Sequence, residues 1–173
     1  VLEDFLHRRG EQYHLKMSSP LSAPEACSRL SVQLASGRLS MRTVVQSTWR
    51  AQQEAKIWPV EQRRTWPKAL AAFQSRLHWH CHFMQKFESE PELEHRNMAR
   101  SCDGLRENDF AEAKFQAWCT GHTGYPFIDA CMRFLIAEGW INFRMRAMLM
   151  SFAAYDLWLH WQRPAHHLAQ LFI

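Results

Sequence analysis

The chain has 173 residues, of which 47% are hydrophobic and 22% are charged, and its formal net charge is +4 at pH 7. These proportions are typical of a globular protein with a real core, and they exclude a disordered tail, a collagen-like repeat and a disulfide miniprotein. Only 6 Gly and 7 Pro are present, which is too few for the many tight turns of an all-β protein. The 8 Trp and 11 Phe indicate either a very aromatic core or a surface that stacks on something planar.

Charge and cysteine usage favour an intracellular, cytoplasmic setting. The small basic excess permits a polyanionic partner without requiring one. The 5 cysteines form no Cys-x-x-Cys pair, which favours a reducing compartment. No apolar run approaches the roughly 20 residues that span a bilayer, so no membrane is expected as a partner. Because the sequence starts inside a helical pattern and stops in an apolar run, we expect it to be a piece of a longer domain.

In the first half of the chain, the patterns predict helices joined by short connections. Residues 22–25, Ser-Ala-Pro-Glu, have the sequence of a capping box and predict a helix that ends at Gly37. Ser40 is placed to cap the next helix. Between 67 and 87, apolar residues recur at helical spacing. The polar, irregular stretch 88–108 predicts a long loop that contains a short helix.

The second half also has helical periodicity. A short amphipathic helix is predicted over 109–118, followed by a turn at 120–124. A helix over 126–138 should begin with its proline and end at the following glycine. A last long helix is predicted over 142–161, with Pro164 beyond its end. Since alternating strand patterns are scarce, the predicted fold class is all-α.

Residues 27–31, Cys-Ser-Arg-Leu-Ser, are a first candidate site. The N–H groups of a helix start, with serine hydroxyls beside them, can bind a phosphate or pyrophosphate. Ordinary helix capping explains the same residues, and on spacing alone it is the better supported of the two interpretations.

The segment around 140–146 is a second candidate. Arg144 and Arg146 are two positions apart on a predicted helix, so they point to different sides. One can face a bound anion while the other faces solvent or a nucleic-acid backbone, and Trp140 can cover a flat ligand. The alternative is that Trp140 and Phe143 belong to the core and that both arginines lie on a solvated surface.

The segment from Trp118 to Phe152 resembles the signature of the flavin-binding domain of the photolyase/cryptochrome family. The matching residues are Trp118, Gly121, Thr123, Gly124, Pro126, Asp129, Ala130, Met132, Arg133, Leu135, Gly139, Trp140, Arg144, Arg146, Ser151 and Phe152. Upstream, residues 28–31 and 36–40 resemble the family's flavin-phosphate segment. The resemblance therefore covers nearly the whole chain.

The resemblance implies a multi-helical FAD-binding domain of which 1–173 is a single helical part. The N-terminal α/β domain, which holds an antenna pigment, and the C-terminal remainder would lie outside this sequence. FAD is the implied cofactor, and because the piece would contain roughly half of the flavin site, the piece alone can lack it. The residues implied to bind it are Tyr13, Ser28, Arg29, Leu30, Ser31, Trp140, Phe143 and Arg146.

The implied activity is that of a deoxyribodipyrimidine photo-lyase. Blue light drives an electron from reduced FAD to a flipped-out pyrimidine dimer in damaged DNA, although we expect the piece alone to be inactive. The residues implied to contact DNA are Arg76, Trp79, His80 and Arg144, with Trp79 as an aromatic platform for the lesion.

Several positions depart from the family pattern on its reaction side. Arg76 stands where photolyases have a glutamate, and Phe143 stands where they have the asparagine that faces the flavin. His80 and Ala147 replace a common arginine and a methionine. These departures favour the alternative, a cryptochrome-type blue-light sensor that binds FAD without repairing DNA.

The electron relay of the family is matched in part. Trp161 matches the middle of the three relay tryptophans, Trp158 is a possible substitute one helical turn earlier, and the outer position falls on Asn108. Helix packing explains both tryptophans equally well. His78 and His82 share a helical face, but zinc would need two more ligands at suitable spacing, so no metal site is expected.

Overall fold

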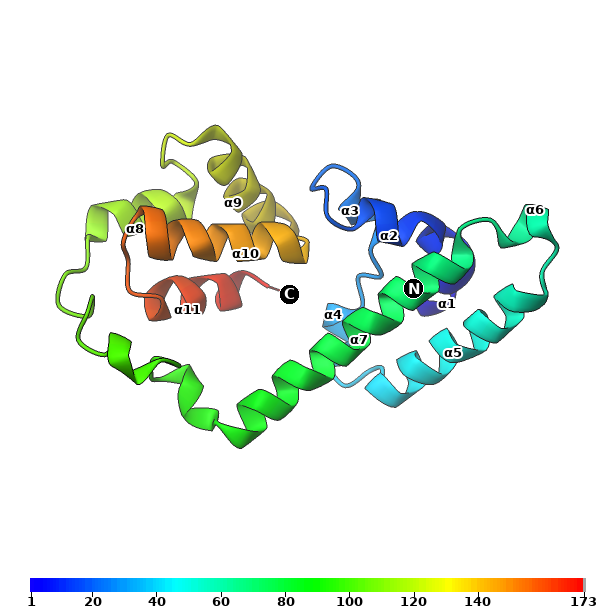
Figure 1. Cartoon of the computed structure of the whole chain (residues 1–173). Coiled ribbons are helices and arrows are strands. Elements are labelled where there is room, and N and C mark those ends of the chain that lie inside the picture. The colour runs from blue at the N-terminus through cyan, green and yellow to red at the C-terminus, as the bar shows by residue number, and fades with distance from the viewer. Residues whose placement is uncertain (173) are drawn as a thin grey trace. The chain divides into compact units, whose positions relative to one another are not determined.

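The computed structural model describes residues 1–172, and every regular element in them is helical (Figure 1). The expected all-α class is thus confirmed. The chain forms two compact units, Val1–Lys86 and Phe87–Ile173. Within the described residues, no helix combines the length and the hydropathy needed to cross a membrane.

The first unit contains one turn-rich half and two long helices. Its elements are α1 (Leu2–His7), the 3-10 helix η1 (Arg9–Gln12), α2 (Tyr13–Lys16), α3 (Ala23–Ala26), α4 (Ser31–Ala35), α5 (Met41–Ile57), α6 (Val60–Arg63) and α7 (Trp66–Ser89), whose last residues belong to the second unit. The expected cap of α5 is confirmed, because Ser40 Oγ accepts a hydrogen bond from Thr43 N at 3.1 Å.

The core of the first unit is built on the apolar faces of its helices. α7 buries Leu70, Phe73 and Leu77 at helical spacing, and these side chains cluster with Phe5 and Val44. Burying side chains of this size contributes about 1.5–3 kcal/mol each.

The second unit begins with a long connection and continues into a helical cluster. Its elements are the 3-10 helices η2 (Pro91–Glu94) and η3 (Arg100–Cys102), α8 (Glu112–Thr120), α9 (Pro126–Glu138), α10 (Phe143–Ser151), the π-helical turn η4 (Phe152–Asp156) and α11 (Gln162–Leu171). The predicted bounds of α9 are confirmed, and Gly139 ends it in the left-handed conformation with φ 61°. α8 begins at Glu112 instead of residue 109.

In the second unit, α9 packs against α8 and α10, and α11 packs against α8. These helices surround the core of the unit. Trp118, Met132, Leu135 and Leu149 are fully buried there. This core holds the turn before α9 and the first turn of α10 in place.

The helix predicted to run from residue 22 to Gly37 is wrong, because the structure has two short helices there. Arg29 adopts a left-handed conformation with φ 53°. Ser22 does not cap α3, since its hydroxyl donates to Lys16 O. The break is explained by Arg9 of the same unit, whose guanidinium donates to the carbonyl groups of Glu25, Cys27 and Ser28. These carbonyls would otherwise accept the next bonds of a continuous helix.

The single helix predicted over 142–161 is also wrong. α10 passes into the π-helical turn η4, and the chain then turns at Trp158, which has φ 59°. Leu157 N donates to Phe152 O and Leu159 N to Ala153 O, both at 3.0 Å, so the ordinary helical ladder stops there. Pro164, expected beyond a helix end, lies in the first turn of α11, where proline is well tolerated.

Candidate functional site

The segment 27–31 is a loop between α3 and α4 that a single arginine holds from within the first unit. Arg9 Nη1 donates to Cys27 O and, at 3.2 Å, to Glu25 O, and Arg9 Nη2 donates to Ser28 O at 2.9 Å. Arg9 Nε donates to Asp4 Oδ2 at 2.7 Å, which fixes the guanidinium itself. The carbonyl groups of the loop are therefore turned toward Arg9.

The side chains of this loop differ in exposure. Leu30 is buried, Ser28 and Arg29 are half-buried, and Ser31 is exposed at the start of α4. The expectation of a helix start is met only by Ser31, and α4 has five residues. The loop nevertheless presents hydroxyl groups beside a helix start, which is the donor chemistry that phosphate oxygens need.

Tyr13 lies beside this loop in an aromatic cluster. Its ring meets those of Phe5 and Phe73 edge to face, with centroids 5.6 and 5.7 Å away. Burial and, to a smaller extent, the nearby Cys27 raise the pKa of Tyr13 to about 12. The hydroxyl therefore stays protonated at neutral pH and is available as a donor. The charge of Arg76 acts on Tyr13 in the opposite direction, so Arg76 lies near it as well.

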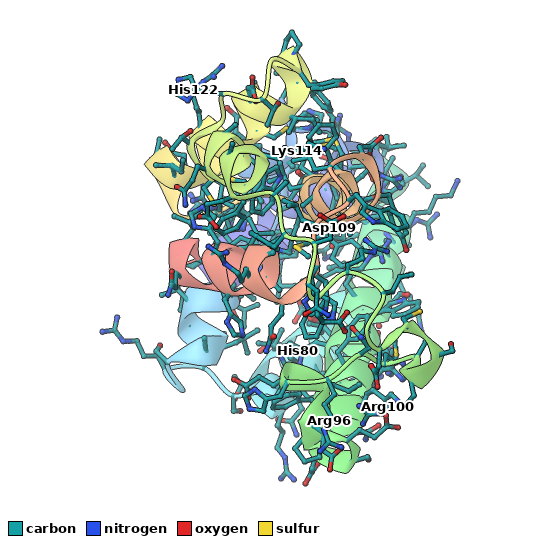
Figure 2. All side chains as sticks on the ribbon, turned by 90° about the vertical axis from the view of Figure 1, so that its left-hand side faces the viewer. His80, Arg96, Arg100, Asp109, Lys114 and His122 are labelled. Atoms are coloured by element: carbon teal, nitrogen blue, oxygen red, sulfur yellow. The ribbon has the colours of Figure 1, made fainter. Side chains whose placement is uncertain are left out.

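On α7, the residues expected to face DNA are exposed. Arg76, Trp79 and His80 are all exposed on α7, and Trp79 is 50% exposed. His80 is labelled in Figure 2. The Trp79 ring lies 5.8 Å from that of Phe83, with 32° between the planes. Phe83 is itself 51% exposed, so it extends the aromatic surface. Its spacing of four from Trp79 was the signal that sequence reasoning missed.

In the second unit, a tight turn precedes α9. Asp129 accepts hydrogen bonds from Thr123 N at 2.8 Å, Thr123 Oγ1 at 2.6 Å and Gly124 N at 3.0 Å. Burial acts to raise the pKa of Asp129, but these bonds together with Arg133 outweigh it and leave the pKa below its usual value. The family signature at these positions thus has a structural role, in which a carboxylate closes a turn.

The start of α10 presents its side chains in different directions. Phe143 is 65% exposed and Arg144 is exposed, whereas Trp140 and Arg146 are half-buried. Exposure of Phe143 contradicts the alternative that places it in the core. The two arginines do lie on different sides of α10.

Arg146 has an unsatisfied donor. Its guanidinium lies over the Phe172 ring, 3.9 Å from the centroid, and burial lowers its pKa. None of the described residues accepts a hydrogen bond from its buried Nε. Because a buried cationic donor without an acceptor is costly, the position suits an anionic ligand. This donor set fits the phosphates or the ring of a bound FAD.

Trp158 and Trp161 lie between η4 and α11 in different surroundings. Trp158 is 47% exposed, and the Arg106 guanidinium lies 4.2 Å from its ring centroid. Trp161 is half-buried and donates from Nε1 to Asn97 Oδ1 at 2.6 Å. Neither tryptophan lies inside a helix, because Trp158 follows η4 and Trp161 directly precedes α11.

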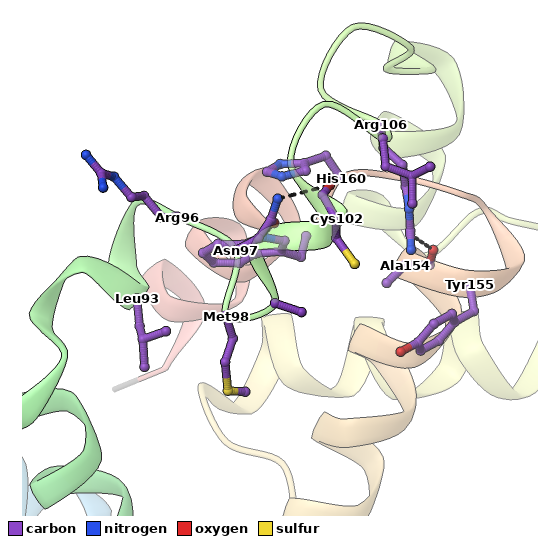
Figure 3. A pocket seen from close by; sticks show the side chains of 12 residues that line it. Leu93, Arg96, Asn97, Met98, Cys102, Arg106, Ala154, Tyr155 and His160 are labelled. Carbon is purple, nitrogen blue, oxygen red and sulfur yellow. Dashed lines mark hydrogen bonds between the residues drawn. The ribbon is translucent and has the colours of Figure 1, made fainter.

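A cavity of about 390 Å³ lies in the second unit beside Trp161 (Figure 3). Its walls are mostly apolar, with Arg96, Arg106 and His160 at the margin. Of the residues expected to bind FAD or DNA, none lines it. Among residues 1–172, no three His, Cys, Asp or Glu side chains are grouped so that they could hold a metal ion.

Sequence reasoning missed Arg9, Asn97 and Arg106, each of which organises a part of these sites. Arg9 bonds to residues 16 to 19 positions away, and Asn97 to one that is 64 positions away. No local pattern reports such pairs.

Known proteins resemble this chain along most of its length. The family model of the FAD binding domain of DNA photolyase matches residues 73–173. The chain is 32% identical over 166 residues to the deoxyribodipyrimidine photo-lyase of Vibrio cholerae serotype O1, which covers 93% of this chain and 32% of that protein. Identity to the Escherichia coli K12 deoxyribodipyrimidine photo-lyase is 30% over 162 residues, with the same coverage.

A shorter stretch of 49 residues is 51% identical to cryptochrome-1 of Sinapis alba and covers 28% of this chain and 10% of that protein. The chain thus spans about a third of the length of the photo-lyases that it matches.

Solved structures have the same fold. A bacterial class III photolyase from Agrobacterium tumefaciens superposes with a TM-score of 0.82 at 26% identity, covering 99% of this chain and 33% of that one. The Synechocystis cryptochrome superposes with a TM-score of 0.79 at 24% identity over 99% of this chain and 34% of that one, a likeness that shows the fold alone.

Proposed function

The chain belongs to the family of FAD-binding domains of DNA photolyase, and from this premise we propose that it supplies part of the flavin site of a light-driven DNA-repair lyase. The observation that carries the proposal is Arg146, a half-buried guanidinium on α10 whose Nε lacks a hydrogen-bond acceptor among the described residues. A negatively charged flavin group would supply that acceptor.

When bound, FAD supplies light absorption and one-electron chemistry. In the proposed site, Arg146 holds negative charge beside the flavin ring and Trp140 covers it. In the first unit, taken by itself, Ser28, Ser31 and the protonated Tyr13 are suited to donate hydrogen bonds to phosphate oxygens. Phe143, which has no polar atom, contributes only an apolar contact.

The exposed aromatic surface of α7 supports a DNA contact. Trp79 and Phe83 present two neighbouring rings, on which unstacked bases can stack at about 1–3 kcal/mol per base. His80 and Arg144 are exposed polar side chains suited to the phosphate backbone. We propose that a flipped-out pyrimidine dimer is the ligand of the aromatic surface of α7.

A cryptochrome-type sensor is the second candidate, and the exposed Arg76 and Phe143 favour it. A guanidinium at position 76 donates hydrogen bonds but cannot accept them as a carboxylate would. A phenyl ring at position 143 cannot hydrogen-bond to the flavin. A sensor does not need a carboxylate at position 76, because it binds no lesion.

Flavin binding is tested by equilibrium dialysis of the 173-residue chain against FAD without DNA. Arg146→Gln should weaken binding about 10- to 100-fold, because hydrogen bonds to charged groups are worth about 1.5–3 kcal/mol. Arg144→Gln, an exposed arginine on the same helix, is the matched control and should leave FAD affinity within about twofold. Equal losses in both variants would contradict the proposal.

Repair and sensing are separated by illuminating dimer-containing DNA with a flavin-loaded form of the protein that carries the complete flavin site. Conversion of dimers supports the lyase, whereas flavin binding without conversion supports the sensor. Trp79→Ala should weaken binding of dimer-containing DNA about 5- to 100-fold through lost stacking. Trp49→Ala, which removes an equally exposed tryptophan from α5, should have no such effect. If Arg76 is what prevents dimer binding, Arg76→Glu should strengthen it.

A further inference from the structure

Asn97 connects Trp161 to two carboxylates in the second unit. The indole Nε1 of Trp161 donates to Asn97 Oδ1 at 2.6 Å. The amide Nδ2 of Asn97 donates to Asp103 Oδ1 at 2.8 Å and to Glu107 Oε1 at 3.1 Å. Asn97 also donates to Cys102 O, and Figure 3 shows this contact at the wall of the cavity.

The neighbours of the Asn97 amide allow only one orientation. With its oxygen toward Trp161, every polar atom of the amide meets a complementary partner. A flipped amide would place two donors face to face at Trp161 and its oxygen against Asp103 and Glu107. The half-buried Asn97 therefore holds the indole in one position and presents an amide oxygen to its N–H.

Negative charge lies on the far side of this amide. The backbone N–H groups of Arg106 and Gly104, with the Asn97 side chain, lower the pKa of Glu107 to about 2, so Glu107 is ionised at neutral pH. A carboxylate that pulls on the amide N–H groups strengthens the acceptor character of the amide oxygen. The edge of the Trp161 ring thus faces an environment that stabilises positive charge.

Trp158 lies in the opposite environment. The Arg106 guanidinium, 4.2 Å from the centroid of its ring, already places a full positive charge against the π face. A second positive charge on that ring would be repelled by Arg106. Of these two neighbouring tryptophans, Trp161 is therefore the easier to oxidise.

We propose that Asn97 is a positioning residue for the one-electron oxidation of Trp161. It orients the indole, stabilises positive charge on it through the carboxylates, and leaves the proton on Nε1, because an amide oxygen is too weak a base to remove it. In this step the indole loses one electron, a photo-excited one-electron acceptor gains it, and no proton moves. The inference rests on the proposed function, in which the bound flavin is that acceptor.

The hydrogen bond is tested without flavin, by NMR of the ¹⁵N-tryptophan-labelled 173-residue chain. The Trp161 indole proton, assigned with Trp161→Phe, should exchange about tenfold more slowly than that of Trp158, since about 1.4 kcal/mol of hydrogen bond corresponds to a factor of ten. Asn97→Leu should abolish this protection. Asn108→Leu, an exposed asparagine of the same loop, should not.

Whether the oxidised Trp161 keeps its Nε1 proton is tested by flash photolysis with a soluble photo-oxidant. The measurement is made at pH 8, where the carboxyl group of an Asn97→Asp variant is ionised. The radical signal that Trp161→Phe removes should have the spectrum of a tryptophan radical cation, and Trp158→Phe should retain it. Asn97→Asp keeps the shape of the side chain but offers a base, so the neutral radical should replace the cation within the same experiment.

Three results would overturn the proposal: a neutral Trp161 radical in the unsubstituted chain, a radical that Trp158→Phe removes, or Asn97 variants that change neither exchange nor spectrum. Because no flavin is present, these outcomes are independent of whether the chain binds FAD. Failure of the proposed function would appear instead in the dialysis experiment, with the radical measurements unchanged.

Discussion

Asp129, a residue of the family signature, stabilises the turn before α9 by hydrogen bonding. It is 6% exposed and accepts three hydrogen bonds from Thr123 and Gly124, while Arg133 donates to Gly121 O at 2.5 Å from the next turn of α9. The Gly-x-Thr-Gly motif is needed for this turn, since a Cβ on Gly121 would lie 2.9 Å from Asp129 O.

Replacing Asp129 by Asn should lower the free energy of unfolding by about 2 kcal/mol at pH 7, because charge-assisted bonds are lost. The folded pKa of Asp129 lies below its unfolded value of about 3.9, so the carboxylate stabilises above pH 4 and loses this effect as pH falls through the folded pKa. Urea unfolding at pH 7 and at a pH below the folded pKa of Asp129 measures this difference in the free energy of unfolding. Asp156→Asn, at an exposed carboxylate, should change little, and an equal loss in both would contradict the prediction.

At the residue scale, the sequence identified candidate residues for flavin and DNA contacts. It did not identify the residues that hold other side chains and loops in position. Arg146 and Trp79 match a family pattern, and the structure leaves both available for a partner. Arg9 and Asn97 match no pattern, because each acts on partners brought near by folding.

At the scale of elements, both wrongly predicted helices fail in the same way. Each is interrupted at a non-glycine residue with positive φ, Arg29 or Trp158. At each break, an arginine from another segment donates to main-chain carbonyls. Arg9 donates to Glu25, Cys27 and Ser28, and Arg106 donates to Ala154 and Leu159. A left-handed residue costs roughly 1–2 kcal/mol, which these charge-assisted bonds offset.

Replacing Arg9 by Lys should therefore loosen the loop before α4. A single ammonium group cannot match the several carbonyls that the guanidinium bonds, so the free energy of unfolding should fall by about 2 kcal/mol. Hydrogen exchange over 27–31 should become faster. The control is Arg8→Lys, because Arg8 is largely exposed and forms an ion pair with Asp4 at 2.8 Å. Unchanged exchange in Arg9→Lys would show that Arg9 does not hold the loop.

Elements defined by local signals were predicted well. α9 has a proline in its first turn and a glycine after its last residue, and α5 has a serine cap, so their limits follow from a few adjacent residues. α7 was recognised from its periodicity, although Phe83 and Phe87 on it are exposed and not part of the core.

At the scale of the whole molecule, each compact unit has its own hydrophobic cluster. One is formed by residues between Phe5 and Leu77 and the other by residues between Phe115 and Leu168. The candidate flavin residues are distributed over both units, with Tyr13 and the 27–31 loop in the first and α10 in the second. Flavin binding is therefore a property that the whole chain must be tested for.

FAD should stabilise the folded chain by mass action. At a free FAD concentration of about 100 times Kd, the gain is about 2.7 kcal/mol, which raises Tm by several degrees for a chain of this size. Calorimetry with and without FAD measures it, and Arg146→Gln should need about tenfold more FAD for the same shift. An unchanged Tm at saturating FAD would contradict binding to the native state.

The sequence alone determined the all-α class, the family, the limits of α9 and the cap of α5, because periodicity, caps and the signature motif depend on residues a few positions apart. Only the tertiary structure decided where Arg9 and Arg106 interrupt helices, that Arg146 keeps a donor unsatisfied, and that Asn97 holds Trp161. These features depend on hydrogen bonds between groups 16 to 64 positions apart, or on burial by distant segments, and such pairs leave no periodic trace in the chain.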